Sequence, residues 1–379
     1  MSARRVFSTL GRACLLLVLL LSSCSVVAGP VRVGFVAELS GRESDLGIAE
    51  RNGALLAVEE INAQKGIAGR KIELIIKDDQ GRPEVAQQVD QQLVDAGVVA
   101  IVGHVTTAQS LAGLAVTQPA GVVMLSPSAS SMELSGLDDG FFRACADNRL
   151  DVQMLAAKML AQGRQHLVIY YDENNAAYAL AYADGVQAAF EAGGGVVLAK
   201  IALPSDVPDF SDWIALGRTA DPDAVLVIAS AVHSALLIQR ARLMGWTTAM
   251  YVSDWAYSET FVQTGGRAVE GVELVAAFDM NMDTPAMRDF RQHYQQRFGY
   301  EPNFGAMQAY EAMMLLARAL QQTHGKADGL PDALRSLENV VVLGDPITMD
   351  AYGDVIRPVY WIRVENGQLV TLGRLTGDD

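Results

Sequence analysis

Short apolar runs alternate with amphipathic segments along the chain. Residues 31–37 form a continuous apolar run, and residues 48–64 place apolar side chains such as Ala54 and Val58 on one helical face. The alternation continues with strands predicted at 71–77, 98–102 and 122–125 and with helices predicted at 83–96 and 108–118. Apolar strands separated by amphipathic helices indicate a parallel sheet covered by helices on both faces.

The same order of elements recurs in the second half, in pattern rather than in residue identity. It predicts strands at 166–171, 196–202, 224–229 and 249–252 and helices at 178–192, 209–219 and 232–244. After residue 271 come a strand at 272–276, helices at 285–298 and 306–323, and two strands near 359–364 and 368–372. We therefore expect two α/β lobes of roughly 120 to 130 residues, with the last helices in the first lobe and the last strands in the second.

The first segment has the pattern of a secretory signal. Residues 1–23 contain three arginines and no acid, and the apolar run at 13–21 is too short to span a bilayer. The run ends in Leu21-Ser22-Ser23-Cys24, which resembles the lipobox of bacterial lipoproteins. We expect a lipoprotein signal peptide at 1–23 and a lipid on Cys24, with cleavage after Ala28 as the alternative. No later stretch approaches about 18 uncharged apolar residues, so membrane attachment is expected only through this lipid.

Charge and cysteine usage exclude several classes of function. The chain has 29 Lys and Arg against 44 Asp and Glu, a formal net charge of −15, which disfavours nucleic acid and anionic membrane surfaces as partners. Only Cys145 follows Cys24, so neither a disulfide framework nor a thiolate metal cluster is expected. The five histidines lack metal-ligand spacing and are interpreted as surface or strand-end residues. Because the sequence holds no catalytic or dinucleotide motif, we expect no enzyme activity, no metal and no cofactor.

The strand pattern also predicts where a ligand would bind. In an open parallel sheet, ligands bind beyond the carboxyl ends of the strands, where the strand order reverses. This rule selects loops at 38–47, 78–82, 103–107 and 126–131 in the first lobe and at 172–178, 203–208, 230–231 and 253–258 in the second. Two such edges that face each other form a cleft.

Six segments carry a resemblance to a known family. They are VRVGFVAELSG at 31–41, NGALLAVEEINAQKGIAGRKIELIIKDDQ at 52–80, VVAIVGHVTTAQSLA at 98–112, MLSPSASSMEL at 124–134, YALAYADGVQAAFEAGG at 178–194 and VSDWAYSETFVQTGGRAVEGV at 252–272. In this order they resemble the type I periplasmic binding proteins, and among them the leucine/isoleucine/valine-binding branch that supplies ABC importers. The resemblance implies a clamshell of two doubly wound, Rossmann-like lobes joined by a three-strand hinge.

The resemblance also implies the lobe boundaries. The chain would cross between lobes near Arg143, Ala276 and Asp350. The N-terminal lobe would then comprise residues 30–143 and 277–349, and the C-terminal lobe residues 144–276 and 350–379.

The first lobe offers four candidate ligand-binding residues. Thr106 and Thr107 close a predicted strand and open a predicted helix, where free N–H groups and a hydroxyl suit a carboxylate. The resemblance implies that Thr107 holds the ligand carboxylate, with Thr106 beside it. It also implies that Ser128 offers its backbone carbonyl to the ligand ammonium and Ser130 its hydroxyl and N–H to the α-substituents. The alternatives are a plain helix cap at Thr107 and a turn built by the serines.

The second lobe offers Asp254 and Tyr178. Asp254 matches the family's acidic residue that pairs with the α-ammonium through a charge-assisted contact, and Tyr178 matches a tyrosine that closes over the ligand. A solvated loop acid and a core tyrosine are the respective alternatives. Leu46 and Ser230 replace aromatic residues of family members, and with Tyr310 they would shape the side-chain pocket.

These observations predict a monomeric, lipid-anchored substrate-binding protein of the periplasm or cell envelope. It would capture an amino acid, branched-chain or related, by hinge closure and present it to the membrane subunits of an ABC permease. Without use of the lipobox it would be secreted and soluble. The alternative is an amide-, urea- or aromatic-acid-binding or sensing protein of the same fold, since fold does not fix function. A secreted hydrolase is the third hypothesis, but no base is placed beside a serine in the pattern.

Overall fold

Two sheets organise the computed structural model, which describes residues 29–41, 44–204 and 209–375. The fold lies in the compact unit that begins at Val31. The predicted signal segment and Cys24 lie outside the described residues. Within the described ranges, no helix combines the length and the apolar character needed to cross a bilayer.

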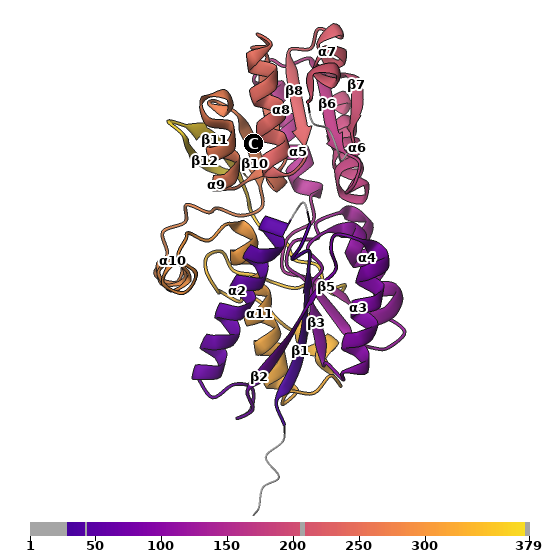
Figure 1. Cartoon of the computed structure of the whole chain (residues 1–379), viewed down its shortest axis with the longest axis vertical. Helices are drawn as coiled ribbons and strands as arrows, with labels where there is room; N and C mark the ends of the chain where they lie inside the picture. The colour runs from indigo at the N-terminus through magenta and orange to yellow at the C-terminus, as the bar shows by residue number, and fades with distance from the viewer. Residues whose placement is uncertain (1–28, 42–43, 205–208, 376–379) are drawn as a thin grey trace, which may run out of the picture. The chain divides into compact units, whose positions relative to one another are not determined.

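The first sheet has five parallel strands in the order β2-β1-β3-β4-β5. The strands are β1 (Val31–Ala37), β2 (Ile72–Asp78), β3 (Ala100–Val102), β4 (Val123–Ser126) and β5 (Phe141–Arg143). The surrounding helices are α2 (Ser44–Ala63), α3 (Pro83–Asp95), α4 (Thr107–Thr117), η1 (Met132–Leu134) and, from late in the chain, α10 (Pro285–Phe298), α11 (Phe304–Gln322) and α12 (Leu330–Arg335). Helix α2 packs against α11 and α3 packs against α4, one pair on each face of the sheet (Figure 1).

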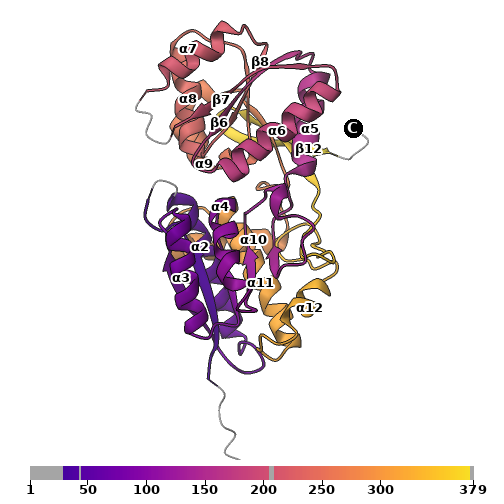
Figure 2. The same ribbon diagram turned by 90° about the vertical axis from the view of Figure 1, so that its right-hand side faces the viewer.

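The second sheet has seven strands in the order β12-β11-β10-β9-β8-β6-β7. Five are parallel: β6 (His166–Asp172), β7 (Val196–Leu203), β8 (Ala224–Ile228), β9 (Ala249–Val252) and β10 (Glu273–Ala276). The edge pair β11 (Val359–Glu365) and β12 (Gln368–Leu375) is antiparallel. The helices are α5 (Arg149–Ala161), α6 (Ala176–Ala192), α7 (Ser211–Thr219), α8 (Ala231–Leu243), η2 (Asp254–Ala256), α9 (Glu259–Gly265) and η3 (Gly266–Val269). Helices α5 and α6 lie on one face and α7 and α8 on the other (Figure 2).

Burial along the strands explains these layers. Every residue of β3, β4 and β8 is buried, as expected for central strands with helices on both faces. In β7 exposed and half-buried residues alternate from Val196 to Lys200, because this strand is an edge of the second sheet. The continuous apolar runs in the sequence therefore mark the centres of the two sheets.

The chain passes between the two sheets three times, after β5, after β10 and before β11. Buried arginines fix the first and third passages. Arg143 pairs with Asp354 at 2.7 Å. Arg357 pairs with Glu311 at 2.7 Å and donates to the backbone carbonyl of Ala144. Because each guanidinium lies out of water, these contacts hold the two passages together.

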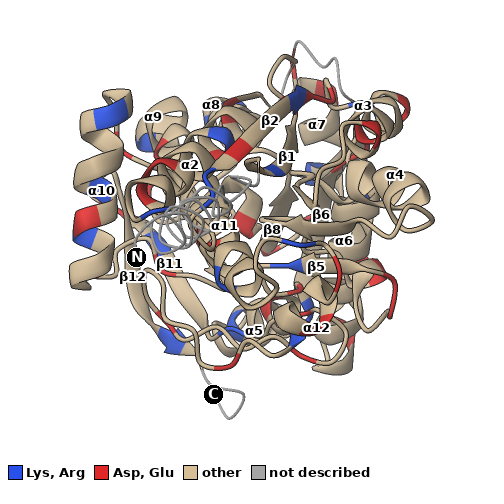
Figure 3. Ribbon diagram, turned by 90° about the horizontal axis from the view of Figure 1, so that it is seen from below, with Lys and Arg blue, Asp and Glu red and all other residues tan. Residues whose placement is uncertain are grey.

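Charged residues at the surface play a smaller part. Acidic and basic positions are interspersed around the molecule when it is seen from below (Figure 3). Exposed pairs such as Arg297–Glu59, whose nearest atoms are 3.1 Å apart, are screened by water and contribute little to stability.

The α/β class and the two-lobe organisation are confirmed, while several elements differ from expectation. The pattern did not predict β5, α5, α9 or α12. The predicted loop at 38–47 is wrong in its second part, because α2 begins at Ser44. Asp45 in the first turn favours a helix start through the helix dipole. Leu46 consequently lies on a helix rather than in a loop.

Candidate functional site

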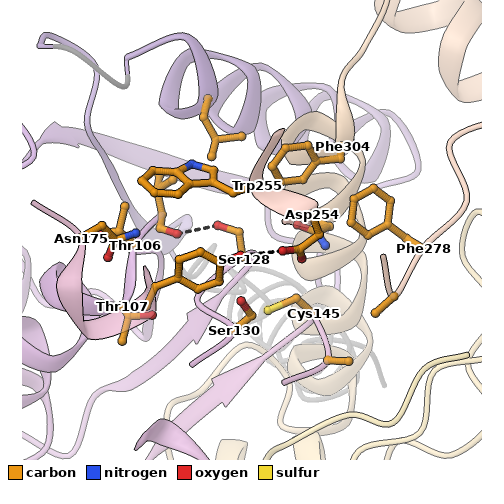
Figure 4. A pocket seen from close by; sticks show the side chains of 16 residues that line it. Thr106, Thr107, Ser128, Ser130, Cys145, Asn175, Asp254, Trp255, Phe278 and Phe304 are labelled. Carbon is orange, nitrogen blue, oxygen red and sulfur yellow. Dashed lines mark hydrogen bonds between the residues drawn. The ribbon is translucent and has the colours of Figure 1, made fainter. Parts of the chain in front are cut away.

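A cavity lies at the carboxyl ends of strands from both sheets and, together with the solvent space at its mouth, encloses about 530 Å³. Its walls come from the segments after β3, β4, β5, β6, β9 and β10 and from helices α2 and α11 (Figure 4). The lining residues are Leu46, Val105, Thr106, Thr107, Ser128, Ser130, Cys145, Ala146, Asn175, Tyr178, Asp254, Trp255, Ala277, Phe278, Phe304 and Gln308.

Seven of the nine predicted ligand-binding residues line this cavity, namely Leu46, Thr106, Thr107, Ser128, Ser130, Tyr178 and Asp254. Ser230 does not; it caps α8 and borders a smaller neighbouring pocket. Tyr310 does not line the cavity either, because its hydroxyl donates to Glu60 Oε2 at 2.6 Å. Gln308 reaches the cavity from the same helix instead. A shift of two residues turns a side chain about 200° around a helix, so motif matching alone misjudged this position.

The start of α4 supplies one polar wall. Thr106 is the N-cap residue in an extended conformation, and its side chain makes no cap hydrogen bond. Thr107 is the first helical residue and is 1% exposed. Both hydroxyls are buried and lack a hydrogen-bond partner within the described ranges. The interpretation of Thr107 as only a helix cap is therefore wrong. Unpaired N–H groups and two free hydroxyls at a helix start are suited to an anion.

Ser128 belongs to a hydrogen-bond chain beside this wall. Its Oγ lies 2.6 Å from Glu50 Oε1 and 2.7 Å from the carbonyl oxygen of Val105. Burial raises the pKa of Glu50 to about 8, so its carboxyl is protonated at neutral pH. A hydroxyl has one proton to donate; Glu50 therefore donates to Ser128, and Ser128 donates to Val105. The Ser128 hydroxyl is thus engaged by the protein.

A fully buried ion cluster lies behind the same loops. His104 Nδ1 is 2.7 Å from Asp79 Oδ2, and His104 Nε2 is 3.0 Å from Asp90 Oδ2. Burial lowers the pKa of His104, but the carboxylates of Asp90 and Asp79 outweigh it and raise the pKa to about 9. The ring is therefore an imidazolium that donates to both acids. Its backbone carbonyl accepts from Ser126 Oγ at 2.7 Å, and Ser126 Oγ accepts from the N–H of Ala129. The interpretation of His104 as a strand-end residue missed this role in holding two site loops.

The opposite polar wall is acidic. Asp254 begins η2 one residue after the end of β9, and the Tyr178 hydroxyl donates to its Oδ1 at 2.7 Å. Burial raises the pKa of Asp254, and the hydrogen bond from Tyr178 opposes that rise. No Lys, Arg or His side chain forms an ion pair with Asp254 among residues 29–41, 44–204 and 209–375. The wall is therefore suited to a cation brought by a ligand.

The remaining wall is aromatic. Rings of Tyr257, Phe278 and Phe304 stack in series, with centroids 5.2 and 5.4 Å apart. Trp255 packs edge-on against Tyr178 at 5.6 Å. Trp255 could have been found from its place beside Asp254 in the matched segment. Phe278 and Phe304 lie in no recognised motif, so no sequence signal identified them.

Two further polar or reactive side chains line the cavity. Gln308 is 6% exposed, and its Oε1 has no hydrogen-bond partner in the described parts of the chain. Burial raises the pKa of the Cys145 thiol to about 12. The thiol therefore stays protonated and acts as a small apolar group, as expected from the sequence.

Comparison with known proteins places this geometry in context. The family model described as periplasmic binding protein matches residues 30–368. The Leu/Ile/Val-binding protein homolog 3 of Brucella melitensis is 24% identical over 353 residues, covering 92% of this chain and 95% of the relative.

Two solved structures extend the comparison. The branched-chain amino acid transporter substrate binding protein LivJ of Streptococcus pneumoniae, in complex with isoleucine, has a TM-score of 0.82 at 25% identity and covers 90% of this chain and 99% of its own. An ABC transporter solute binding protein of R. palustris, in complex with benzoate, has a TM-score of 0.84 at 19% identity and covers 91% and 96%. The second likeness shows the fold alone.

Proposed function

This chain belongs to the type I periplasmic binding protein family, in its leucine/isoleucine/valine-binding branch, as a substrate-binding protein of ABC transport, and we propose that its substrate is a free amino acid. One observation carries the proposal. A single cavity combines an anion-binding helix start at Thr106 and Thr107 with the unpaired acid Asp254. A free amino acid carries both matching charges on one carbon. A ligand without the amine would leave the acid uncompensated, at a cost in free energy.

The aromatic wall supports a bulky apolar side chain on that amino acid. Trp255, Phe278, Phe304 and Leu46 offer apolar surface next to the polar walls. Burying a side chain of the size of leucine or phenylalanine stabilises a complex by about 1.5 to 3 kcal/mol. The Leu/Ile/Val-binding homolog of Brucella and the isoleucine bound in the Streptococcus structure support the branched-chain or related class.

A second candidate is an aromatic carboxylic acid. The same aromatic wall and the benzoate held by the R. palustris neighbour favour it. Such a ligand would use the start of α4 but would bring no cation to Asp254.

Thermal unfolding separates the two candidates. A chain beginning at Ser25, refolded to remove carried-over ligand, is heated with amino acids, their amides and simple aromatic acids. A ligand at 100 times its Kd should stabilise by about 2.7 kcal/mol. Stabilisation by free amino acids and not by their amides supports the proposal. Stabilisation only by aromatic acids would replace it with the second candidate.

The cellular setting completes the proposal. We propose that the lobes, 30–143 with 277–349 and 144–276 with 350–379, close around the ligand, and that the closed form docks on the membrane subunits of an ABC permease. The protein would act as a monomer in the periplasm or cell envelope, held by a lipid on Cys24. Incorporation of an alkyne fatty acid, lost in Cys24→Ser, tests the anchor; absence of label in the unmodified sequence would contradict it.

A further inference from the structure

A buried carboxamide reaches the cavity from helix α11. Gln308 lines the cavity, and only 6% of the residue is exposed. Its Oε1 is buried and has no hydrogen-bond partner in the described parts of the chain. A buried acceptor without a donor raises the free energy of the site, so its presence in a folded protein calls for an explanation.

A second glutamine on the same helix shows the ordinary arrangement. Gln321 Oε1 accepts from the backbone N–H of Ala68 at 3.0 Å, and Gln321 Nε2 donates to the carbonyl of Gly66 at 2.9 Å. Both ends of that carboxamide thus bind a loop of the protein. The amide oxygen of Gln308 binds no such loop, so it is available to a group that enters the cavity.

Close packing on α2 holds the helix that carries Gln308 in place. A Cβ atom at Gly305 would lie 2.4 Å from Leu46 Cδ1, and a Cβ atom at Gly53 would lie 2.0 Å from the carbonyl oxygen of Ala306. Contacts this short leave no room for a methyl group at either glycine, so α11 has little freedom to shift against α2. The backbone of Gln308 is therefore pre-organised, which lowers the entropy lost when a ligand binds.

The neighbours of Gln308 in the cavity are apolar. Phe304 lies four residues before Gln308 on the same face of α11, and its ring stacks on that of Phe278 (Figure 4). Leu46 meets α11 at Gly305, one turn from Gln308, and lines the same cavity. The amide oxygen is therefore a polar atom next to the aromatic wall, which suits a side chain with an apolar body and one donor group.

The groups proposed for the ligand's α-carbon come from other elements. The start of α4 is proposed for the carboxylate, and Asp254 on η2 is proposed for the ammonium. Asn175 also lines the cavity with an unpartnered Oδ1, but it precedes α6 and the turn to Tyr178, the partner of Asp254. Gln308 lies instead beside the aromatic wall, where the ligand's side chain is expected.

We propose that Gln308 is a specificity-determining residue whose Oε1 accepts a hydrogen bond from the ligand's side chain. The inference rests on the proposed amino-acid function and narrows it to amino acids whose side chain has an apolar body and an O–H or N–H group. Threonine and tyrosine meet this description, whereas leucine, isoleucine, valine and phenylalanine do not. A side chain without the donor leaves the buried oxygen unpartnered, and sites built to bind a hydroxyl reject analogues that lack it.

Matched pairs of ligands test this subsite. Threonine and valine have nearly the same shape, and tyrosine differs from phenylalanine only by its hydroxyl. Isothermal titration calorimetry with the refolded chain should show, in the pair that fits the cavity, about tenfold tighter binding of the hydroxyl-bearing member. Gln308→Met keeps the length of the side chain and removes the amide, so it should reduce this preference to within about twofold.

The stability of the ligand-free protein separates recognition from a structural role. Because Gln308→Met removes a buried oxygen without a partner, its unfolding midpoint should equal or exceed that of the wild type. Gln322→Met is the control. Gln322 is exposed on the same helix, 3.3 Å from Ser336 Oγ, and its replacement should leave the preference unchanged. If Gln308→Met does not fold, Gln308→Leu carries the same comparison.

The outcomes distinguish the subsite from the proposed function. Amino-acid binding with no preference for the hydroxyl in any pair, or with a preference that Gln308→Met leaves unchanged, would overturn the subsite and leave the proposed function standing. A lower midpoint with equal losses for both members would show a structural role, which also overturns the subsite. Binding of aromatic acids alone would overturn the proposed function, and para-hydroxybenzoate against benzoate would then decide the subsite by the same criterion. No binding of any amino acid or aromatic acid would overturn both.

Discussion

Two acidic clusters lie beside the cavity, and they differ in how their charge is balanced. In the first lobe, Asp79 and Asp90 lie on either side of His104, so the protein supplies its own cation. In the second lobe, Asp254 accepts a hydrogen bond from Tyr178 but has no basic partner among the described residues. A balanced cluster holds loops in place whether or not ligand is present. An acid without a basic partner raises the free energy of the site until a cation binds, and the relief of that free energy favours a cationic ligand.

Replacing His104, the cation of the first cluster, should have the largest effect on stability. His104→Gln would leave two buried aspartates uncompensated and should lower the free energy of unfolding by about 3 to 5 kcal/mol. Urea denaturation followed by circular dichroism measures the change. His166→Gln is the control, because that histidine is exposed beside Asp223 and should matter by less than about 1 kcal/mol. Equal stability of the two variants would show that the first cluster is not balanced by His104.

Neutralising the unbalanced cluster should act on binding instead. Asp254→Asn should weaken amino-acid binding by about 2 to 5 kcal/mol and leave the fold intact, because the ligand's ammonium loses its charged partner. Calorimetry gives the affinity, and the far-ultraviolet spectrum checks the fold. Unchanged affinity would remove Asp254 from the site.

The first cluster also predicts a response to pH. The folded pKa of His104 is about 9, above the value of about 6.5 for an unfolded histidine. Its stabilisation is therefore complete below about pH 6.5 and is lost as pH rises through about 9, a change of about 3 kcal/mol. Glu50, raised to about 8, adds a loss in the same direction between about pH 4.5 and 8. Urea midpoints across this range should fall with pH, and flat midpoints would contradict the imidazolium.

The smallest effect is expected at the start of α4. Thr107→Ala should weaken carboxylate-bearing ligands by about 1.5 to 3 kcal/mol, the usual contribution of a hydrogen bond to a charged group. Carboxamide analogues should be affected less, since their oxygen carries no full charge. Calorimetry with both ligand types makes the comparison, and an equal loss would argue against a carboxylate at Thr107.

Much of this site follows from the strand-end rule. Thr107 and Asp254 were predicted because each follows a recognisable apolar strand and lies in a matched segment. Gln308 was not predicted, although it lines the cavity from α11 and its buried Oε1 has no partner in the described parts of the chain. Its significance depends on the absence of a partner, and hydrogen-bond partners are set by packing between distant segments rather than by local sequence.

The aromatic wall of the cavity also could not be predicted from local sequence. Phe278 follows the second passage between the sheets, and Phe304 begins a helix 26 residues later in sequence number. Their ring centroids are 5.4 Å apart, and this stacking depends on how two distant segments of the chain pack together. Tyr310 was predicted in place of Gln308 because a motif match does not show which face of a helix points into the cavity.

The arginines of the interlobe passages limit how the molecule can deform. The backbone N–H of Arg143 donates to the carbonyl of Gly353, Ala146 forms a bridge with Val355, and Arg357 holds the Ala144 carbonyl. These hydrogen bonds hold the first and third passages together. We therefore expect one sheet to rotate against the other about an axis near these residues, as a repeatable one-axis movement rather than a general displacement.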